Sequence, residues 1–189
     1  SQLVECATRV FIEQGYRRTQ MADIAEGLGV AKGTLYLYVE SKDALFDLVT
    51  RCADGEHPLP KLSALPLPTP APGSTIAYVR DVLAAHREFP ALTAALRRTR
   101  VRDARTELET ILGELYDVLA RHRRGIKLID RSAVDHRELG PLWFEGARGG
   151  MRKALAAYLV ARSESRVLRP SADVANTARM ILETVVFWA

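Results

Sequence analysis

Apolar residues recur at intervals of three and four along most of this chain, which places them on one face of an α-helix. The repeat is clearest near the beginning, at Leu3, Cys6, Ala7, Val10 and Phe11. Gly15 follows this stretch and is expected to end the helix. Because no segment of useful length alternates apolar and polar residues as a strand does, the pattern predicts an all-α fold.

Three shorter helices are predicted next, over roughly residues 20–27, 31–38 and 41–53. Thr19 and Ser41 are suitable N-cap residues for the first and third of these helices, and Gly29 breaks the chain between the first and second. Two short helices joined by a glycine turn are typical of a helix-turn-helix, and the motif is predicted at residues 20–39.

A helix-turn-helix requires apolar side chains at fixed offsets, a small residue where its helices cross, and a turn residue that accepts left-handed backbone. Ala25 is the small residue and Gly29 is the turn residue. Counted from Met21, the apolar positions are Ile24, Leu28, Val30, Leu35 and Tyr38. Every requirement is met, so the motif predicts DNA binding.

Six prolines between Pro58 and Pro72 interrupt the helical pattern, because a helix interior does not tolerate proline. We therefore predict a Pro-rich connector at 54–73, between an N-terminal DNA-binding domain (1–53) and a helical effector-binding and dimerisation domain (74–189). A loop this long is either a disordered connector or a lid over a ligand cavity, and the sequence is compatible with both.

The second domain is predicted to contain helices at about 74–87, 90–99, 104–124, 141–163 and from Ser171 to the end. Gly125 follows three basic residues and is expected to be the left-handed cap of the long third helix. An irregular stretch is then expected before Pro141, which suits the first turn of the next helix.

Composition and charge narrow the class of protein without deciding it. With 48% apolar and 26% charged residues, the chain is suited to a globular fold with a buried core. The net charge of the chain is +4, but the positive excess lies outside the region that contains the motif. Residues 1–57 carry six basic and nine acidic side chains. Bulk charge is therefore weak evidence, and the motif carries the prediction.

Several classes of protein and site are not expected. The longest near-apolar run, Ile181 to Ala189, is too short to cross a bilayer, and no export leader precedes the first helix. Cys6 and Cys52 do not make a disulfide framework. No metal-ligand spacing and no catalytic motif is present, so we expect a cytoplasmic protein without membrane contact, metal, cofactor or enzyme activity.

A set of glycines, aromatic residues and lysines occurs in a fixed order between Phe11 and Leu45. Its members are Phe11, Gly15, Tyr16, Thr19, Asp23, Ile24, Ala25, Gly29, Val30, Lys32, Gly33, Thr34, Leu35, Tyr36, Tyr38, Ser41, Lys42 and Leu45. This pattern resembles the DNA-binding domain of the TetR/AcrR family of bacterial transcriptional regulators. Around Ile181 to Ala189 the chain is also loosely similar to AefR-type members.

The resemblance implies which residues contact DNA. They are Thr19, Gln20, Lys32, Gly33, Thr34, Tyr36, Tyr38 and Lys42. Those that begin the second and fourth helices would bind phosphate, and the others would reach base edges or the DNA backbone. Tyr38 also occupies an apolar position of the motif, so its ring is either packed with only the hydroxyl free or turned toward DNA.

Two surfaces are predicted in the second domain. Small residues of the penultimate helix and apolar residues of the last helix would form a four-helix dimer interface, or else pack only within their own subunit. They are Ala147, Gly150, Ala154, Ala157, Ala161, Ile181 and Val185. The candidate walls of a mostly apolar effector pocket are Tyr78, His86, Phe89, Leu92, Leu112, Tyr116, Trp143 and Phe144.

Together these features predict a homodimeric repressor that binds a double-stranded operator and is released by a small, mostly hydrophobic effector. An alternative is compatible with the same residues: a helix-turn-helix protein controlled by a protein partner, or acting architecturally, without a small-molecule effector.

Overall fold

The computed structural model describes residues 1–55, 57–86, 89–101 and 103–189. Within these ranges the ordered elements are helical, and the β-type pairing is a single isolated bridge between Val39 and Leu67. The predicted all-α class is therefore confirmed. None of the helices in the described ranges combines the length and hydropathy that crossing a bilayer requires.

The chain divides into two compact units, residues 1–82 with 122–143, and residues 83–121 with 144–189. The elements of the first are α1 (Gln2–Gln14), α2 (Met21–Leu28), α3 (Lys32–Leu35), α4 (Lys42–Cys52), the 3-10 turn η1 (Leu62–Ala64), most of α5 (Ser74–Ala85) and α8 (Arg123–Ala133). Those of the second are α6 (Pro90–Arg97), α7 (Ala104–Arg121), most of the π-helical η2 (Pro141–Arg148), α9 (Gly149–Glu164) and α10 (Val174–Trp188). The boundaries of these units differ from those of the predicted domains, because α8 packs on α1 and so belongs to the first unit. The predicted domains stay a prediction.

The first unit is built around fully buried apolar side chains from all four N-terminal helices. Phe11, Ile24, Leu35, Leu45 and Val49 are each at most 1% exposed. These are positions that the three- and four-residue repeat predicts on the inner faces of their helices, where burying each side chain stabilises the fold by about 1.5–3 kcal/mol. The core thus fixes the helices that carry the helix-turn-helix.

The predicted end of the long helix is wrong. Helix α7 ends at Arg121, and Gly125 lies in the first turn of α8, which occupies most of the stretch expected to be irregular. The carboxylate of Asp54 accepts hydrogen bonds from the amides of Arg124 and Gly125, at 3.0 and 2.9 Å. A Cβ atom at Gly125 would collide with that carboxylate. Gly125 therefore permits the close approach of an N-terminal helix cap and does not supply left-handed backbone.

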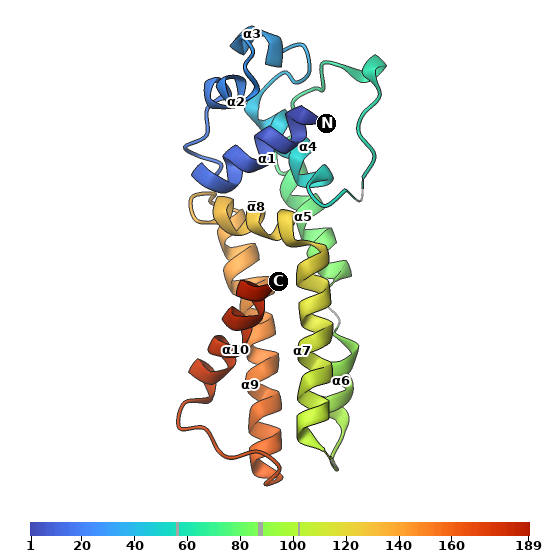
Figure 1. Ribbon diagram of the computed structural model, residues 1–189, viewed down its shortest axis with the longest axis vertical. Helices are drawn as coiled ribbons and strands as arrows, with labels where there is room; N and C mark the ends of the chain where they lie inside the picture. The colour runs from blue at the N-terminus through green and yellow to red at the C-terminus, as the bar shows by residue number, and fades with distance from the viewer. Residues whose placement is uncertain (56, 87–88, 102) are drawn as a thin grey trace. The chain divides into compact units, whose positions relative to one another are not determined.

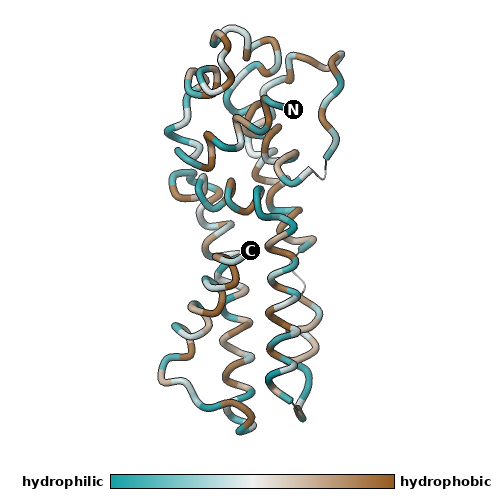
Figure 2. Tube along the Cα trace, viewed as in Figure 1, coloured by the Kyte–Doolittle hydropathy of each residue, from teal (hydrophilic) through white to brown (hydrophobic). Residues whose placement is uncertain are grey.

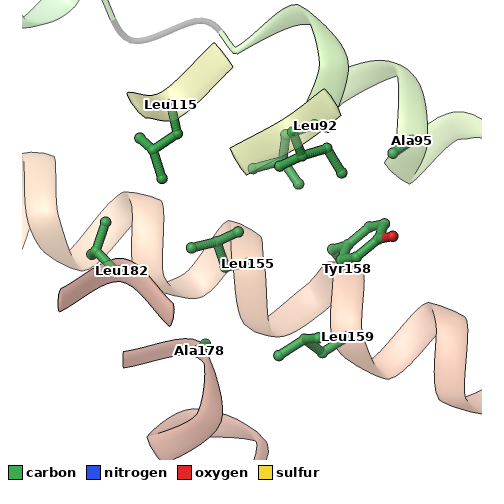
Figure 3. Close-up of a cluster of buried hydrophobic side chains, with 9 residues drawn as sticks. Leu92, Ala95, Leu115, Leu155, Tyr158, Leu159, Ala178 and Leu182 are labelled. Atoms are coloured by element: carbon green, nitrogen blue, oxygen red, sulfur yellow. The ribbon is translucent and has the colours of Figure 1, made fainter. Parts of the chain in front are cut away.

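The second unit has its own apolar core, to which α6, α7, α9 and α10 contribute. Leu155 of α9 points toward Leu92 and Leu115, and Leu182 of α10 lies on the other side of α9 (Figure 3). Apolar and polar stretches alternate along these helices, as amphipathic packing requires (Figure 2).

A buried ion pair lies beside this core. Arg162 of α9 is 2% exposed, and its guanidinium donates to both carboxylate oxygens of Glu107 on α7, at 2.7 and 3.1 Å. The same guanidinium donates to the carbonyl oxygens of Ala95 and Arg98 at the end of α6. One side chain therefore connects three helices, and each of its hydrogen bonds is strengthened by the charge.

We predict that Glu107→Gln lowers the free energy of unfolding at pH 7 by about 3 kcal/mol, because it leaves the charge of Arg162 buried without a counter-ion. The hydrogen bond from Arg162 lowers the pKa of Glu107, so this stabilisation is present above the ordinary pKa of 4.5. It is lost as the pH falls through the lowered pKa, and the two proteins should then become alike. Urea unfolding across pH measures this, with the exposed Glu109→Gln as control; equal stability at pH 7 would contradict it.

Candidate nucleic-acid interface

The turn between α2 and α3 has the backbone that the motif requires. Gly29 has φ +67° and ψ +30°, a left-handed conformation that glycine adopts without strain. Its neighbour Val30 donates its amide hydrogen to the carbonyl of Ala25 at 3.0 Å. At the other end of α2, the carboxylate of Asp23 accepts the amide hydrogen of Gln20 at 2.8 Å. The helix that supports α3 is thus capped at both ends.

Residues 32–38, which we call the reading segment, are anchored by buried side chains on one side and exposed on the other. Leu35 and the following Val39 are buried, at 1% and 0% exposure, whereas Tyr36 and Tyr38 are 42% and 41% exposed. A Cβ atom at Gly33 would meet no other atom within 4 Å. Figure 1 shows α3 at the outer edge of the first unit. The segment therefore presents its lysine and tyrosines to the surroundings.

Tyr38 does not occupy an apolar core position, so that part of the motif assignment is wrong. Helix α3 is a single turn ending at Leu35, and the residues after it form a turn in place of the helix expected to reach 38. The change of backbone directs Val39 inward and leaves Tyr38 outside. Of the two alternatives, the structure favours the ring of Tyr38 turned outward.

Thr19 is placed differently from the expectation that it binds phosphate. Its side chain is 1% exposed, and its hydroxyl donates to the carbonyl of Gly15 at 2.7 Å. Its amide hydrogen also goes to that carbonyl, at 3.3 Å. Thr19 therefore has no donor left for phosphate and instead closes the turn between α1 and α2. Gln20, the next residue, is exposed.

Lys42 is half-buried against the neighbouring loop, and its expected phosphate contact stays a prediction. Its ammonium lies within 3.1–3.4 Å of the carbonyl oxygens of Tyr16, Arg17 and Thr19 and 4.6 Å from the centre of the Tyr16 ring. The Tyr16 hydroxyl donates to Asp43, and burial, followed by this hydrogen bond, raises its pKa. Lys42 therefore ties the start of α4 to the loop that precedes α2.

Two basic residues that the sequence analysis passed over lie in the same loop. Arg17 and Arg18 are exposed, and with Arg131 and Asp135 they line an open cleft of about 290 Å³. The amide of Arg17 donates to the Asp135 carboxylate at 3.4 Å. An adjacent pair of arginines just before a helix start was a visible signal for positive charge beside the motif.

The candidate effector residues fall in both units. Tyr78 and Trp143 belong to the first, where Tyr78 lies under the guanidinium of Arg51 and the indole N–H of Trp143 donates to Asp130 at 2.7 Å. The candidates that belong to the second unit are His86, Phe89, Leu92, Leu112, Tyr116 and Phe144. Leu92 is part of its core and Phe89 packs against it. An effector pocket stays a prediction.

The candidate dimer residues are partly used within the chain. Ala154, Ile181 and Val185 pack against the core of the second unit. Gly150 and Ala157 are exposed, and the remaining two are half-buried: Ala147 and Ala161. Large apolar side chains on the same two helices are also exposed, and they are Val160, Met180, Phe187 and Trp188. The dimer interface likewise stays a prediction.

Comparison with known proteins identifies the first helices. Residues 3–49 match the model of the family described as bacterial regulatory proteins, tetR family. This region is similar to that family. The matched residues, which we call the tetR-type domain, include α2, α3 and most of α1 and α4. This domain contains the whole helix-turn-helix, and the predicted resemblance is confirmed.

Two relatives match a part of this chain of similar length to the family match. The fatty acid metabolism regulator protein of Bacillus subtilis is 43% identical over 42 residues, which is 22% of this chain and 22% of that protein. The HTH-type transcriptional repressor KstR2 of Mycobacterium tuberculosis is 40% identical over 50 residues, 26% of this chain and 25% of that protein. The chain thus matches a quarter or less of the length of these relatives. The first is named a regulator protein and the second a transcriptional repressor.

The fold similarity extends further than the sequence similarity. The solved structure of KstR2 from M. tuberculosis matches 99% of this chain and 81% of its own length, with a TM-score of 0.53 and 21% identity. This supports the same all-helical fold beyond the tetR-type domain.

We predict that Lys42→Met destabilises the protein by about 1.5–3 kcal/mol, because it removes charged hydrogen bonds to carbonyl oxygens while keeping the apolar stem. Urea unfolding measures the change, and Lys127→Met, at an exposed position of α8, is the matched control. If both variants unfold at the urea concentration of the wild type, Lys42 does not hold the loop.

Proposed function

We propose that this protein is a transcriptional regulator that inserts its reading segment into the major groove of operator DNA. The observation that carries the proposal is the reading segment itself, a one-turn helix anchored by Leu35 while its tyrosines stay about two-fifths exposed. A recognition helix needs a buried side that fixes it to the domain and an exposed side that can enter the groove. The match of residues 3–49 to the tetR family supports the same function.

The contacts can be divided by their chemistry. Lys32, at the first turn of α3, has an ammonium suited to phosphate or to guanine O6 and N7. Tyr36 and Tyr38 have exposed rings, and a phenolic hydroxyl donates to phosphate oxygens or to base acceptors. Gln20 stands at the start of α2, where an amide side chain contacts the DNA backbone. The proposed contact set omits the side chains of Thr19 and Lys42.

The proposal includes a homodimer formed through α9 and α10. A single helix-turn-helix reads a short half-site, and pairing of two copies doubles the contact surface and fixes the spacing of the half-sites. The exposed apolar side chains of these helices, together with the exposed Gly150 and Ala157 of α9, support this choice of surface. Sedimentation velocity tests it, since a monomer at all micromolar concentrations would remove the dimer from the proposal.

We further propose that the regulator is a repressor released by a small hydrophobic effector. The matching relative KstR2 is named a repressor, and the second unit contains an extended apolar core among four helices. An effector would release DNA only to the extent that it prefers the conformation that does not bind DNA. The alternative is control by a protein partner, or architectural binding without an effector. A screen for small molecules that release the bound operator distinguishes them.

We predict that Tyr36→Ala and Lys32→Ala each weaken operator binding about 5- to 100-fold, the range of one lost base or phosphate contact of about 1–3 kcal/mol. The operator is obtained by selection from a random-sequence duplex library, and affinity is measured by fluorescence anisotropy. Tyr116→Ala is the control, because Tyr116 is 43% exposed, as Tyr36 is, but lies on α7 in the second unit. Wild-type affinity in both test variants would remove the reading segment from the interface.

A further inference from the structure

The Pro-rich segment between α4 and α5 pairs with the chain that follows the reading segment. The amide of Leu67 donates to the carbonyl of Tyr38 at 2.8 Å, and its carbonyl accepts the amide hydrogen of Glu40 at 3.0 Å. These two hydrogen bonds form the parallel bridge between Val39 and Leu67. The segment is therefore attached to the end of the candidate interface, a contact that neither a disordered connector nor a cavity lid implies.

Thr69 makes a second attachment two residues later. Its amide donates to the Glu40 carboxylate at 2.9 Å, and its hydroxyl donates to the Ser41 hydroxyl oxygen at 2.8 Å. That oxygen also accepts the amide hydrogen of Ala44 at 3.1 Å and is the N-cap of α4. Thr69 therefore joins the end of the reading segment to the start of α4.

The proline spacing explains why this segment pairs in one register. Pro66, Pro68 and Pro70 have no amide hydrogen, so Leu67 and Thr69 are the donors available between them. Proline also restricts the chain to extended backbone, so pairing loses little conformational entropy. A Pro-Leu-Pro-Thr sequence is thus suited to a short, preorganised attachment.

The far end of the segment is also attached to α4. The Thr75 hydroxyl, in the first turn of α5, donates to the carboxylate of Asp47 at 2.8 Å, and Asp47 pairs with Arg51 at 2.8 Å. The chain from Leu67 to Thr75 is therefore attached to the end of the reading segment at Leu67 and to α4 at Thr75. Both attachments lie within the first unit.

We propose that residues 66–69, which we call the strap, are a positioning element for DNA binding. This inference rests on the proposed function. A one-turn helix has little stability of its own, because nucleation fixes several residues for one hydrogen bond. By holding Tyr38, Glu40 and Ser41, the strap keeps the reading segment in its binding conformation before DNA arrives. The strap acts through this segment and not through a DNA contact of its own.

The test uses the full chain and a duplex selected from a random library by the wild-type protein. Thr69→Val removes the hydroxyl donor at nearly constant shape and should weaken binding about 3- to 10-fold, the equivalent of one neutral hydrogen bond. Replacing residues 66–69 by Gly-Ser-Gly-Ser should weaken it more than 10-fold. Thr69→Ser restores the hydroxyl and should bind as the wild type does. Thr93→Val, at an exposed threonine of α6, is the matched control.

Two readouts separate positioning from contact and from general instability. In the DNA-free protein, the hydrogen-bonded amides of Tyr36, Leu37 and Tyr38 should exchange hydrogen faster in Thr69→Val than in the wild type, whereas loss of a direct DNA contact would leave this exchange unchanged. The Glu40 amide should exchange its hydrogen faster in the Gly-Ser variant, while the melting temperature of Thr69→Val stays close to that of the wild type. Wild-type affinity in both strap variants, or unchanged amide exchange at residues 36–38 in DNA-free Thr69→Val, would overturn the proposal that the strap positions the reading segment. Failure of the wild type to select or bind any duplex would instead overturn the proposed function.

Discussion

Burial of Leu35 and Val39 is the constraint on which the proposed reading surface depends. Helix α3 has four residues, too few for a helix that is stable by itself. The two buried side chains, each worth about 1.5–3 kcal/mol, fix the segment between them and direct its other residues away from the core. Exposure of Lys32, Tyr36 and Tyr38 is a consequence of this anchoring. The strap acts on the same short stretch from its C-terminal side.

The polar interactions around the motif hold its loops and do not extend the DNA surface. Lys42 and Thr19 donate to carbonyl oxygens of the loop before α2, and we therefore leave both side chains out of the proposed DNA contacts. The first 57 residues are acidic overall, and the attraction to DNA must therefore come from locally exposed cations. Lys32 and the pair Arg17 and Arg18 are exposed cations of this kind within or beside the motif.

The sequence was sufficient for features that depend on local chemistry. The helical class, the left-handed turn at Gly29 and the N-cap at Ser41 follow from residue types and their spacing. The sequence was insufficient where contacts with distant segments determine the conformation or the role of a residue. Tyr38 lies outside the core and Val39 inside it because α3 ends early, and Gly125 lies in a helix start that Asp54 caps from 71 residues away.

The same limit applies to the candidate site. The proline spacing was visible, but its meaning depends on pairing with residues 38–41, which no local pattern encodes. Lys42 and Thr19 have the residue types of phosphate ligands, and only the positions of nearby carbonyl groups show that they face inward. Sequence reasoning identified the motif, and the packing decided which of its residues are free to act.

The central claim is that the reading segment meets DNA. The most direct measurement follows the backbone amide resonances of isotopically labelled protein while the selected duplex is added. The account predicts that the largest changes occur at Gln20 and at residues 32–38, with smaller changes in the second unit. Saturated DNA binding with unchanged resonances at residues 32–38 would contradict it.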